Sequence, residues 1–431
     1  MQHAALYLKK RRSRRPLNSV LNMMRNPAVL LLSICIFFIG LGYSLTLPFM
    51  PLFGVERVGM TPLSLGTFLA VGSLCGIICS TLIGRLSDRK PIRKWIVIAS
   101  AVSASLGYVF YAFNENYVVL LIVVSTLIAI SYAAFPQLFA LAREITEKEA
   151  SVDIPVVMSV LRALVSLAWI VGPVIASFVI QRFDYQGLFL TVSVMYLLVG
   201  LFVLFLPAQH QVTKQPDDAL TQTPAPAAKI NFKSALLSPH VVFALLAFMA
   251  FEIANSMGGI ATPLYVTQDL SGGKLDVGII AGVNAALQVP IMVTLGLLAK
   301  RFGSSVLMNF AGLFGAAYYL FLMLTKSTIH IMAIQIFSAI FIAIVLGIGM
   351  TFFQDLLPKM IGTATTLYNN ANILGSMGGG LLAGVIGEYY EIKTVILASA
   401  LLCFVGFVLL KISTARNASR LRIGKGGSYE G

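Results

Sequence analysis

The sequence is poor in charged residues, and this scarcity bounds the fold class before any motif is considered. Asp, Glu, Lys and Arg make up only 11% of the 431 residues, hydrophobic residues make up 58%, and the mean hydropathy is +0.87. A soluble domain carries about 25% charged residues, so this composition excludes an ordinary soluble protein. The chain is therefore predicted to be an integral membrane protein that has the lipid bilayer as its surroundings.

Cysteine and histidine are also scarce, with four residues of each. The cysteines lie inside apolar runs and show no metal-ligand spacing with histidine, so neither a metal site nor a disulfide framework is predicted. We interpret them as small buried hydrophobic residues; they are Cys35, Cys75, Cys79 and Cys403. No set of nucleophile and base is recognisable, so the sequence predicts no catalytic residues, no metal and no enzymatic activity.

Acidic residues are outnumbered by basic ones, 17 against 31, which gives a formal net charge of +14. Such an excess also occurs in proteins that bind nucleic acids. Here the basic residues stand in tails and short segments that flank apolar runs of about 20 residues, the length that crosses a bilayer. Because Lys and Arg collect on the cytoplasmic side of membrane proteins, the distribution indicates topology, and no nucleic-acid partner is expected.

Twelve apolar runs predict an all-α membrane protein with twelve transmembrane helices. A polar segment rich in Pro, Thr and Ala separates the sixth run from the seventh and predicts a cytoplasmic linker. The expected domains are a basic cytoplasmic N-terminus, a first six-helix half, the linker, a second six-helix half and a cytoplasmic tail, at residues 1–27, 28–206, 207–238, 239–412 and 413–431. The runs lie at 28–53, 62–83, 95–113, 117–142, 156–181, 187–206, 239–267, 276–299, 305–325, 328–356, 363–387 and 391–412.

The basic residues also predict the orientation. With both termini in the cytoplasm, 25 Lys and Arg residues fall on the cytoplasmic side and five fall in outer loops, namely Arg57, Arg182, Lys274, Lys326 and Lys393. Because Lys and Arg are retained on the cytoplasmic side, both termini are predicted to be cytoplasmic.

A short charged segment, residues 84–94 with the sequence GRLSDRKPIRK, separates the second apolar run from the third and is predicted to be a loop. Its pattern, Gly-x-x-x-Asp-Arg followed by clustered Arg and Lys, resembles the signature loop between helices 2 and 3 of major facilitator transporters. Two positions depart from that pattern: Pro91 stands where the family usually has Gly, and Ile92 where it has a basic residue. The alternative is a solvated loop that only sets the topology.

The resemblance implies gating roles for this segment. Gly84 would let two helix ends approach closely. Asp88, followed by Arg89, would close the cytoplasmic face by contacting the start of helix 11 near Gly362 and Thr363. A carboxylate suits such a contact because the unpaired N–H groups of a helix N-terminus favour an anion. Asp355, at the cytoplasmic end of helix 10, is a further gating candidate.

The two halves resemble each other at this place. Residues 296–303, with the sequence GLLAKRFG, follow helix 8 as the charged segment follows helix 2, and Lys300 stands where Asp88 stood. Two parallel six-helix halves with a site between them are the architecture that this repeat implies.

Three stretches narrow the resemblance to one family. They are residues 135–144, residues 161–173 with Leu161-Arg162 and Gly172-Pro173, and residues 337–367. Together they look like the bacterial sugar efflux transporter family. This resemblance implies an exporter of lactose-type and glucosyl sugars that takes up protons in exchange. This resemblance implies a multi-pass protein of the cell inner (plasma) membrane, a monomer, with no cofactor beyond the proton gradient.

Polar side chains inside spans are costly, so we treat them as candidate functional residues. Glu252 in helix 7 is the candidate for proton coupling. Arg162 in helix 5 shares a helix face with Ser166 and Trp169, and could hydrogen-bond sugar hydroxyls while the indole ring packs on the sugar's C–H face. Neutral amides and hydroxyls recognise polyols without opposite charge, and they complete the predicted substrate site: Gln137, Asn255, Asn284, Gln288, Tyr368, Asn369 and Asn372.

Each of these residues also has a structural interpretation. Arg162 could be an ion-pair partner of Glu252, and each amide could serve only as an interhelical contact. Related members carry an acidic residue just before the Pro-Leu of helix 7, where this chain has Thr262 before Pro263, and a Glu where it has Gln288. Glu252 is therefore the only acid deep in the second half: it couples proton movement, or coupling differs here.

The leading functional hypothesis is proton-linked export of sugars or sugar-like glycosides, with the small-molecule sugar and protons as partners. Export of amphipathic drugs by a multidrug/proton antiporter is the alternative within transport. A membrane sensor or assembly factor that transports nothing is a different class, but we expect no soluble domain large enough to signal, because the linker and tails are short. Uptake of proton and sugar together also stays open, because energetics rather than a motif sets the direction.

Overall fold

The computed structural model describes residues 26–89, 92–147, 154–206, 238–358 and 360–426. Within these ranges the chain forms helices and no strand, which confirms the all-α prediction. Most of the predicted basic N-terminus and linker, Lys90 and Pro91 of the charged segment, and the end of the tail lie outside the described residues.

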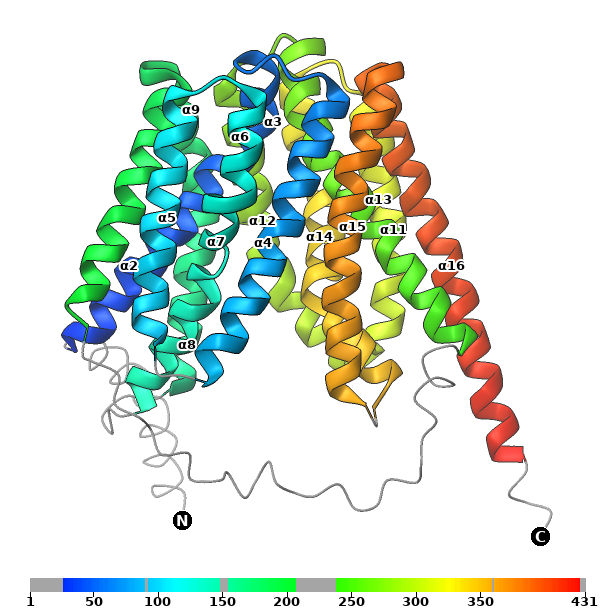
Figure 1. Ribbon diagram of the computed structural model, residues 1–431. Coiled ribbons are helices and arrows are strands. Elements are labelled where there is room, and N and C mark those ends of the chain that lie inside the picture. Colours follow the sequence, from blue (N-terminus) through cyan, green and yellow to red (C-terminus); the bar gives the residue numbers. More distant parts are fainter. Residues whose placement is uncertain (1–25, 90–91, 148–153, 207–237, 359, 427–431) are drawn as a thin grey trace, which may run out of the picture. The chain divides into compact units, whose positions relative to one another are not determined.

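Ten helical segments among the described residues are long and apolar enough to cross a membrane, so the chain is a multi-pass membrane protein. Figure 1 shows them in sequence colours. The first five spans are α2 (Pro27–Thr46) with η1 (Leu47–Phe49) and α3 (Met50–Glu56), α4 (Pro62–Arg89), α5 (Arg93–Phe113), the series α6 (Tyr117–Val123), η2 (Val124–Ile128), α7 (Ala129–Ser131) and α8 (Ala134–Glu147), and α9 (Ile154–Leu204). The others are α11 (Pro239–Leu264) with η3 (Tyr265–Asp269), α12 (Lys274–Phe302), α13 (Ser304–Leu324), α14 (Thr328–Leu356) and α16 (Ile392–Gly426).

The predicted apolar runs lie in described helices, and the run at 328–356 coincides with α14. The run at 363–387 lies in α15 (Ile361–Tyr389), a glycine-rich helix that is not among the ten apolar spans. α16 continues to Gly426, well past the predicted end of its run at residue 412.

The prediction of a loop over residues 84–94 is wrong for residues 84–89 and 93–94, which are helical. α4 continues through Gly84 and Asp88 and ends at Arg89, and α5 begins at Arg93. Exposed polar residues can extend a helix beyond its apolar run, and a cation in the last turn is favoured by the helix dipole. The signature segment is therefore mainly the last turns of α4.

The predicted runs at 156–181 and 187–206 lie in one 51-residue segment, α9, which bends at Asp184. Asp184 has φ 58° and ψ −170°, a region that residues other than glycine rarely adopt. The Asp184 carboxylate accepts a hydrogen bond from the Tyr185 backbone N–H at 2.7 Å and pairs with Arg57. These contacts hold the backbone at the bend.

The described residues group into two compact units. Unit 1 takes residues from Met1–Gly59, Val71–His210 and Lys274–Gly282, and unit 2 takes residues from Met60–Ala70, Gln211–Gly273 and Val283–Gly431. α4 thus begins in unit 2 and continues in unit 1, whereas α12 begins in unit 1 and continues in unit 2.

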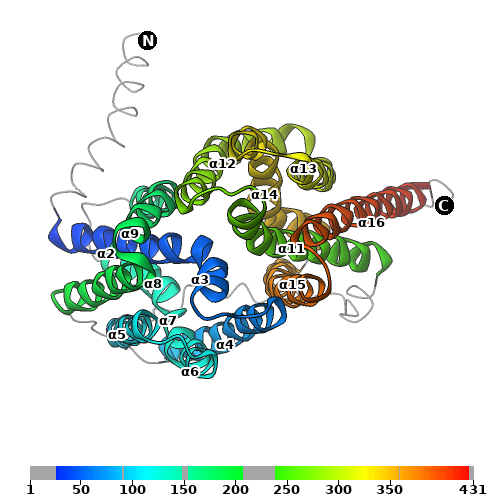
Figure 2. The same cartoon turned by 90° about the horizontal axis from the view of Figure 1, so that it is seen from above.

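In unit 1, α9 packs against α2 and α5, and the view in Figure 2 shows α2 beside α9. The Ser44 hydroxyl of α2 donates to the Ala168 carbonyl of α9 at 2.8 Å. Gly172 lies directly against Ser44, so a side chain there would separate the two helices. Tyr108 of α5 stacks on the Tyr196 ring of α9 with centroids 5.8 Å apart, and both are buried.

In unit 2, α11 packs against α15 and α16, and α13 packs against α14 and α16. The Ser256 hydroxyl of α11 donates to the Ser376 carbonyl of α15 at 2.9 Å. The buried Tyr319 of α13 donates to the Ala254 carbonyl of α11, also at 2.9 Å. Gly375 of α15 lies against the Glu252 side chain, so these helices approach closely beside that carboxyl group.

This packing predicts that two glycines of α15 respond oppositely to the same substitution. In Gly375→Ala the new Cβ would collide with the Cβ of Glu252, whereas in Gly378→Ala it would meet Ile253 at an ordinary 3.5 Å. Overpacking costs about 1–3 kcal/mol, and replacing a helical glycine by alanine gains about 1 kcal/mol. Thermal unfolding in detergent should give a lower midpoint for Gly375→Ala and an equal or higher one for Gly378→Ala. Equal midpoints for the two variants would contradict the packing.

Candidate functional site

Glu252 lies at the centre of a buried polar cluster in unit 2. Its side chain, on α11, is only 3% exposed. Asn255, almost one turn later, and Asn372 of α15 hydrogen-bond its carboxyl group. The carboxyl oxygen Oε1 has no hydrogen-bond partner among the described residues. The cluster is therefore a carboxyl group held by neutral amides, with one oxygen unpaired.

The other two predicted residues of α15 lie differently. Tyr368 is buried, donates to the Leu346 carbonyl at 3.4 Å, and packs its ring on Phe248 with centroids 5.1 Å apart. Its hydroxyl and ring thus serve helix packing. Asn369 is exposed. Of the three polar residues predicted on α15, Asn372 is the one that contacts Glu252.

The predicted amides of α12 belong to a hydrogen-bonded network. The amide nitrogen of Asn284 donates to the Gln335 side-chain oxygen at 2.7 Å and to the Ser338 hydroxyl at 3.0 Å, both on α14. Gln288 in turn donates to the Asn284 side-chain oxygen. Asn284 thus makes an interhelical contact between α12 and α14.

In unit 1, Gln137 of α8 is 6% exposed, and its Oε1 atom has no partner among the described residues. A buried acceptor without a donor is costly. Gln137 and Glu252 thus each bury a side-chain oxygen without a hydrogen-bond partner. Among the described residues, only Ser100 and Asn309 do so as well.

Arg162 is exposed on α9, and Trp169 is half-buried. α9 contacts α2 through Ala168, whose Cβ lies 3.1 Å from where a Gly40 Cβ would be. It contacts α12 through Ile170, whose carbonyl lies 2.9 Å from a Cβ built on Gly282. Helical periodicity places Arg162 and Trp169 together between these two contacts.

The predicted gating residues are solvent-facing. Asp88 pairs with Arg93 at 2.7 Å, and Arg93 also pairs with Glu144 of α8 at 3.1 Å. Arg89 is exposed in the last turn of α4. A Cβ added to Gly84 would meet no described atom within 4 Å.

Asp355 is exposed near the end of α14. Its carboxylate accepts a hydrogen bond from the Ser304 hydroxyl at 2.5 Å, at the first residue of α13. This contact joins the end of α14 to the start of α13.

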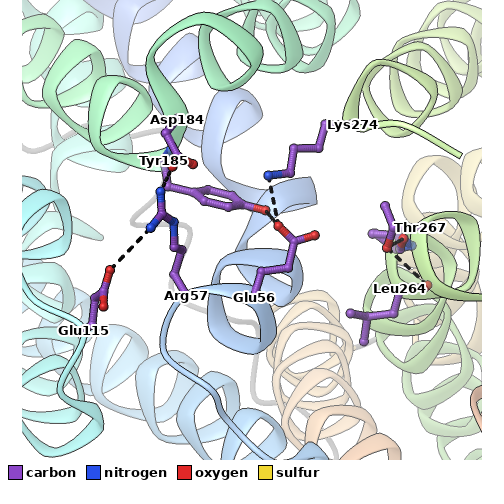
Figure 3. A network of polar contacts seen from close by, with 9 residues as sticks. Glu56, Arg57, Glu115, Asp184, Tyr185, Leu264, Thr267 and Lys274 are labelled. Carbon is purple, nitrogen blue, oxygen red and sulfur yellow. Dashed lines mark hydrogen bonds and ion pairs between the residues drawn. The ribbon is translucent and has the colours of Figure 1, made fainter. Parts of the chain in front are cut away.

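An ionic cluster that sequence reasoning missed lies in unit 1 around the bend of α9 (Figure 3). The Glu56 carboxylate at the end of α3 accepts from the Tyr185 hydroxyl and pairs with Lys274 of α12, both at 2.9 Å. The Lys274 ammonium also lies 4.4 Å from the centre of the Tyr185 ring. Beside them, Arg57 pairs with Asp184 and, at 3.8 Å, with Glu115.

Comparison with known proteins decides the family. A family model described as Major Facilitator Superfamily matches residues 32–372 and 244–427. A protein of Deinococcus radiodurans is 34% identical over 90% of this chain and 99% of its own length. Sugar efflux transporter A of Dickeya chrysanthemi is 32% identical over 85% of this chain and 92% of its own. The chain belongs to the sugar efflux transporter family of the major facilitator superfamily.

The fold agrees with solved structures of other transporters. The crystal structure of nucleoside transporter NupG superposes with a TM-score of 0.74, covering 90% of this chain and 98% of that one, at 15% identity. At this identity the likeness shows the major facilitator fold alone.

The sequence of this member of the sugar efflux transporter family contained a signal for some, but not all, of these polar residues. Gln335 is an amide in the middle of an apolar run, the same signal that marked Asn284, yet sequence reasoning overlooked it. The Glu56–Lys274 pair gave no such signal, because both residues stand at helix ends 218 positions apart.

The ionic cluster predicts a measurable coupling between Glu56 and Lys274. The side chains are 34% and 28% exposed, so a pair of this kind is worth roughly 0.5–1 kcal/mol. Thermal unfolding of Glu56→Gln, Lys274→Gln and the double variant should show less than additive destabilisation.

The exposed Arg143–Glu147 pair, at 2.8 Å, is the control, and the same cycle there should give a smaller coupling. Strictly additive effects of the Glu56 and Lys274 substitutions would show that the pair does not stabilise the bend.

Proposed function

We propose that this protein is a secondary active transporter that exports sugars or sugar-like glycosides in exchange for protons by alternating access. Relatives named sugar efflux transporter, among them transporter B of Salmonella typhimurium at 32% identity, support the substrate class. The surroundings of Glu252 are the observation that carries the proton-coupled mechanism.

A carboxylate ion inside a membrane needs a cation or several N–H donors to offset its lost hydration. Glu252 has amide partners, Asn255 and Asn372, and an oxygen without a donor. This environment suits a carboxyl group that carries its own proton. Release of that proton requires different surroundings, and only such a difference between two states of the transporter can link proton movement to sugar movement.

Sugar recognition, in this proposal, uses polar side chains that the sequence predicts within the spans. The unpaired Gln137 oxygen can accept a hydrogen bond from a hydroxyl, and the exposed Asn369 offers both a donor and an acceptor. Arg162 has room to hydrogen-bond hydroxyls, while the Trp169 ring can pack against the apolar C–H face of a sugar. This set of groups favours a polar, uncharged substrate.

The twelve-helix architecture in two halves and the topology are part of the proposal. The bend at Asp184 divides α9 into two helices, and α15 adds a further one to the apolar spans. The contacts of α2 with α9 in unit 1 resemble those of α11 with α15 in unit 2, each including a serine that donates to a carbonyl. The proposed protein is a monomer in the inner membrane with both termini in the cytoplasm. A reporter that works only in the cytoplasm should therefore be active when it is fused to the C-terminus.

The function is tested with inverted membrane vesicles that contain the protein and have an acidic interior. Labelled sugars and glycosides should accumulate inside against their gradient, and vesicles without the protein are the control. Accumulation of amphipathic drugs instead of sugars would favour the multidrug alternative. If sugar leaves the vesicles together with protons, the protein takes up sugar into the cell instead of exporting it.

Glu252→Gln separates proton coupling from sugar binding. Because the amide cannot release a proton, the variant should exchange labelled sugar across the membrane at near the normal rate, yet lose accumulation in a pH gradient. Glu252→Asp keeps the acid and is the matched control, which should retain part of the accumulation. If Glu252→Gln still concentrates sugar, this residue is not the coupling acid.

Asp88 is proposed to act in gating at the cytoplasmic end. Asp88→Asn removes the charge that pairs with Arg93, and we expect normal abundance in the membrane with transport reduced several-fold. Arg143→Gln, which breaks the neighbouring exposed pair with Glu147, is the control and should transport normally. Full transport by Asp88→Asn would leave Asp88 a topological role only.

A further inference from the structure

Six polar side chains from four helices of unit 2 form one continuous hydrogen-bonded relay. Three of them are buried in the helix bundle, with 2% of Gln335, 4% of Tyr318 and 6% of Ser338 exposed. The members are Thr262 on α11, Asn284 and Gln288 on α12, Tyr318 on α13, and Gln335 and Ser338 on α14. Buried amides that are fully hydrogen-bonded adopt one orientation, so the relay is a rigid element.

The donors and acceptors of Asn284 are almost fully used. Its two N–H groups face the Gln335 side-chain oxygen and the Ser338 hydroxyl, and its oxygen accepts from Gln288. An asparagine has only two N–H donors, so Asn284 has none left for a ligand. Its amide plane is fixed by three partners on two helices.

Gln335 is fixed in the same way. Its oxygen accepts from Asn284 at 2.7 Å, and its nitrogen donates to the Tyr318 hydroxyl at 3.3 Å. Tyr318 in turn hydrogen-bonds Thr262 of α11. The orientation of the amides in the relay thus depends on the buried Tyr318, which acts on Asn284 of α12 through Gln335.

Gln288 is the open end of the relay. It is half-buried and donates one N–H group to the Asn284 side-chain oxygen, which is the hydrogen bond that the described residues provide for it. An amide held at one N–H presents its oxygen and its remaining N–H in a fixed direction. Two adjacent hydroxyls of a sugar match that pair, because one hydroxyl can donate to the oxygen while the next accepts from the N–H.

We propose that Gln288 is the amide of α12 that binds the sugar, through two adjacent hydroxyls, and that Gln335 and Tyr318 are positioning residues that hold it through Asn284. This inference rests on the proposed transport of sugars. It divides the two amides predicted on α12 into a ligand-binding residue and a residue committed to the relay. Prior fixation of a flexible glutamine favours binding because the ligand does not have to order it.

The experiment measures binding of a transported sugar and of its monodeoxy analogues to the purified full-length protein. In the wild type, removing one of the two contacted hydroxyls should weaken binding about tenfold or more, since one polar partner is then left unpaired. Gln288→Leu should reduce this discrimination to about twofold or less. Gln335→Leu should do the same, although residue 335 is buried and is linked to Gln288 only through Asn284.

The discrimination ratio separates positioning from general stability. A variant that only loosens the fold weakens the sugar and all its analogues alike, and so leaves the ratio unchanged. Gln335→Glu is the conservative variant: a protonated glutamate has the same arrangement of acceptor and donor as glutamine, so the ratio should stay near that of the wild type.

Neighbouring tyrosines of α13 provide a matched pair that keeps the packing volume. Tyr318→Phe removes the partner of Gln335 and should lower the ratio, whereas Tyr319→Phe removes only a bond to the Ala254 carbonyl and should not. A wild-type ratio in Gln288→Leu and in both Gln335→Leu and Tyr318→Phe would overturn the inference. A wild-type protein that binds no sugar would overturn the proposed function instead.

Discussion

Hydrogen bonding in the interior of the membrane is the constraint on which this structure depends. A polar group there finds no water, so the protein itself has to supply its partner. Serines meet this need between helices: Ser44 donates to the Ala168 carbonyl, and Ser256 donates to the Ser376 carbonyl. Glycines beside these serines let the backbones approach closely. The same contacts therefore satisfy polar groups and set the spacing of the helices.

Two of the four departures from this rule among the described residues are candidate functional residues. Gln137 and Glu252 each bury an oxygen without a partner, and both were selected from the sequence as polar residues within apolar runs. An unpaired buried acceptor costs free energy that a proton or a ligand hydroxyl can recover. Unpaired buried oxygens therefore mark both residues as candidates for functional roles.

The ion pairs of the described residues lie near the ends of helices or at the bend of α9, where the side chains are partly exposed. Glu56 ends the first span and Arg57 follows it, and their partners Lys274 and Asp184 stand at the start of α12 and at the bend of α9. Placing ion pairs there avoids the cost of burying charge in the hydrocarbon region. Asp184 shows a second use of this arrangement, because Arg57 stabilises a residue whose backbone conformation is unfavourable.

The apolar runs were predictable because hydropathy is a local property of about 20 consecutive residues. The membrane class and the helical fold follow from it, whereas the resemblance to the family came from the charged segment after the second run together with residues 135–144, 161–173 and 337–367. Boundaries were less predictable: α4 extends through Asp88 to Arg89, because exposed polar residues lengthen a helix that hydropathy alone would end.

The sequence by itself determined which polar residues lie within the membrane, and among them were Glu252, Asn284 and Gln288. Only the tertiary structure decided their partners. Asn284 of α12 hydrogen-bonds Gln335 and Ser338 of α14, 51 and 54 positions away. Glu252 of α11 is hydrogen-bonded by Asn372 of α15. A hydrogen bond requires two atoms within about 3.5 Å and a suitable angle. Helix packing brings such atoms together, and no local pattern of residues records which faces meet.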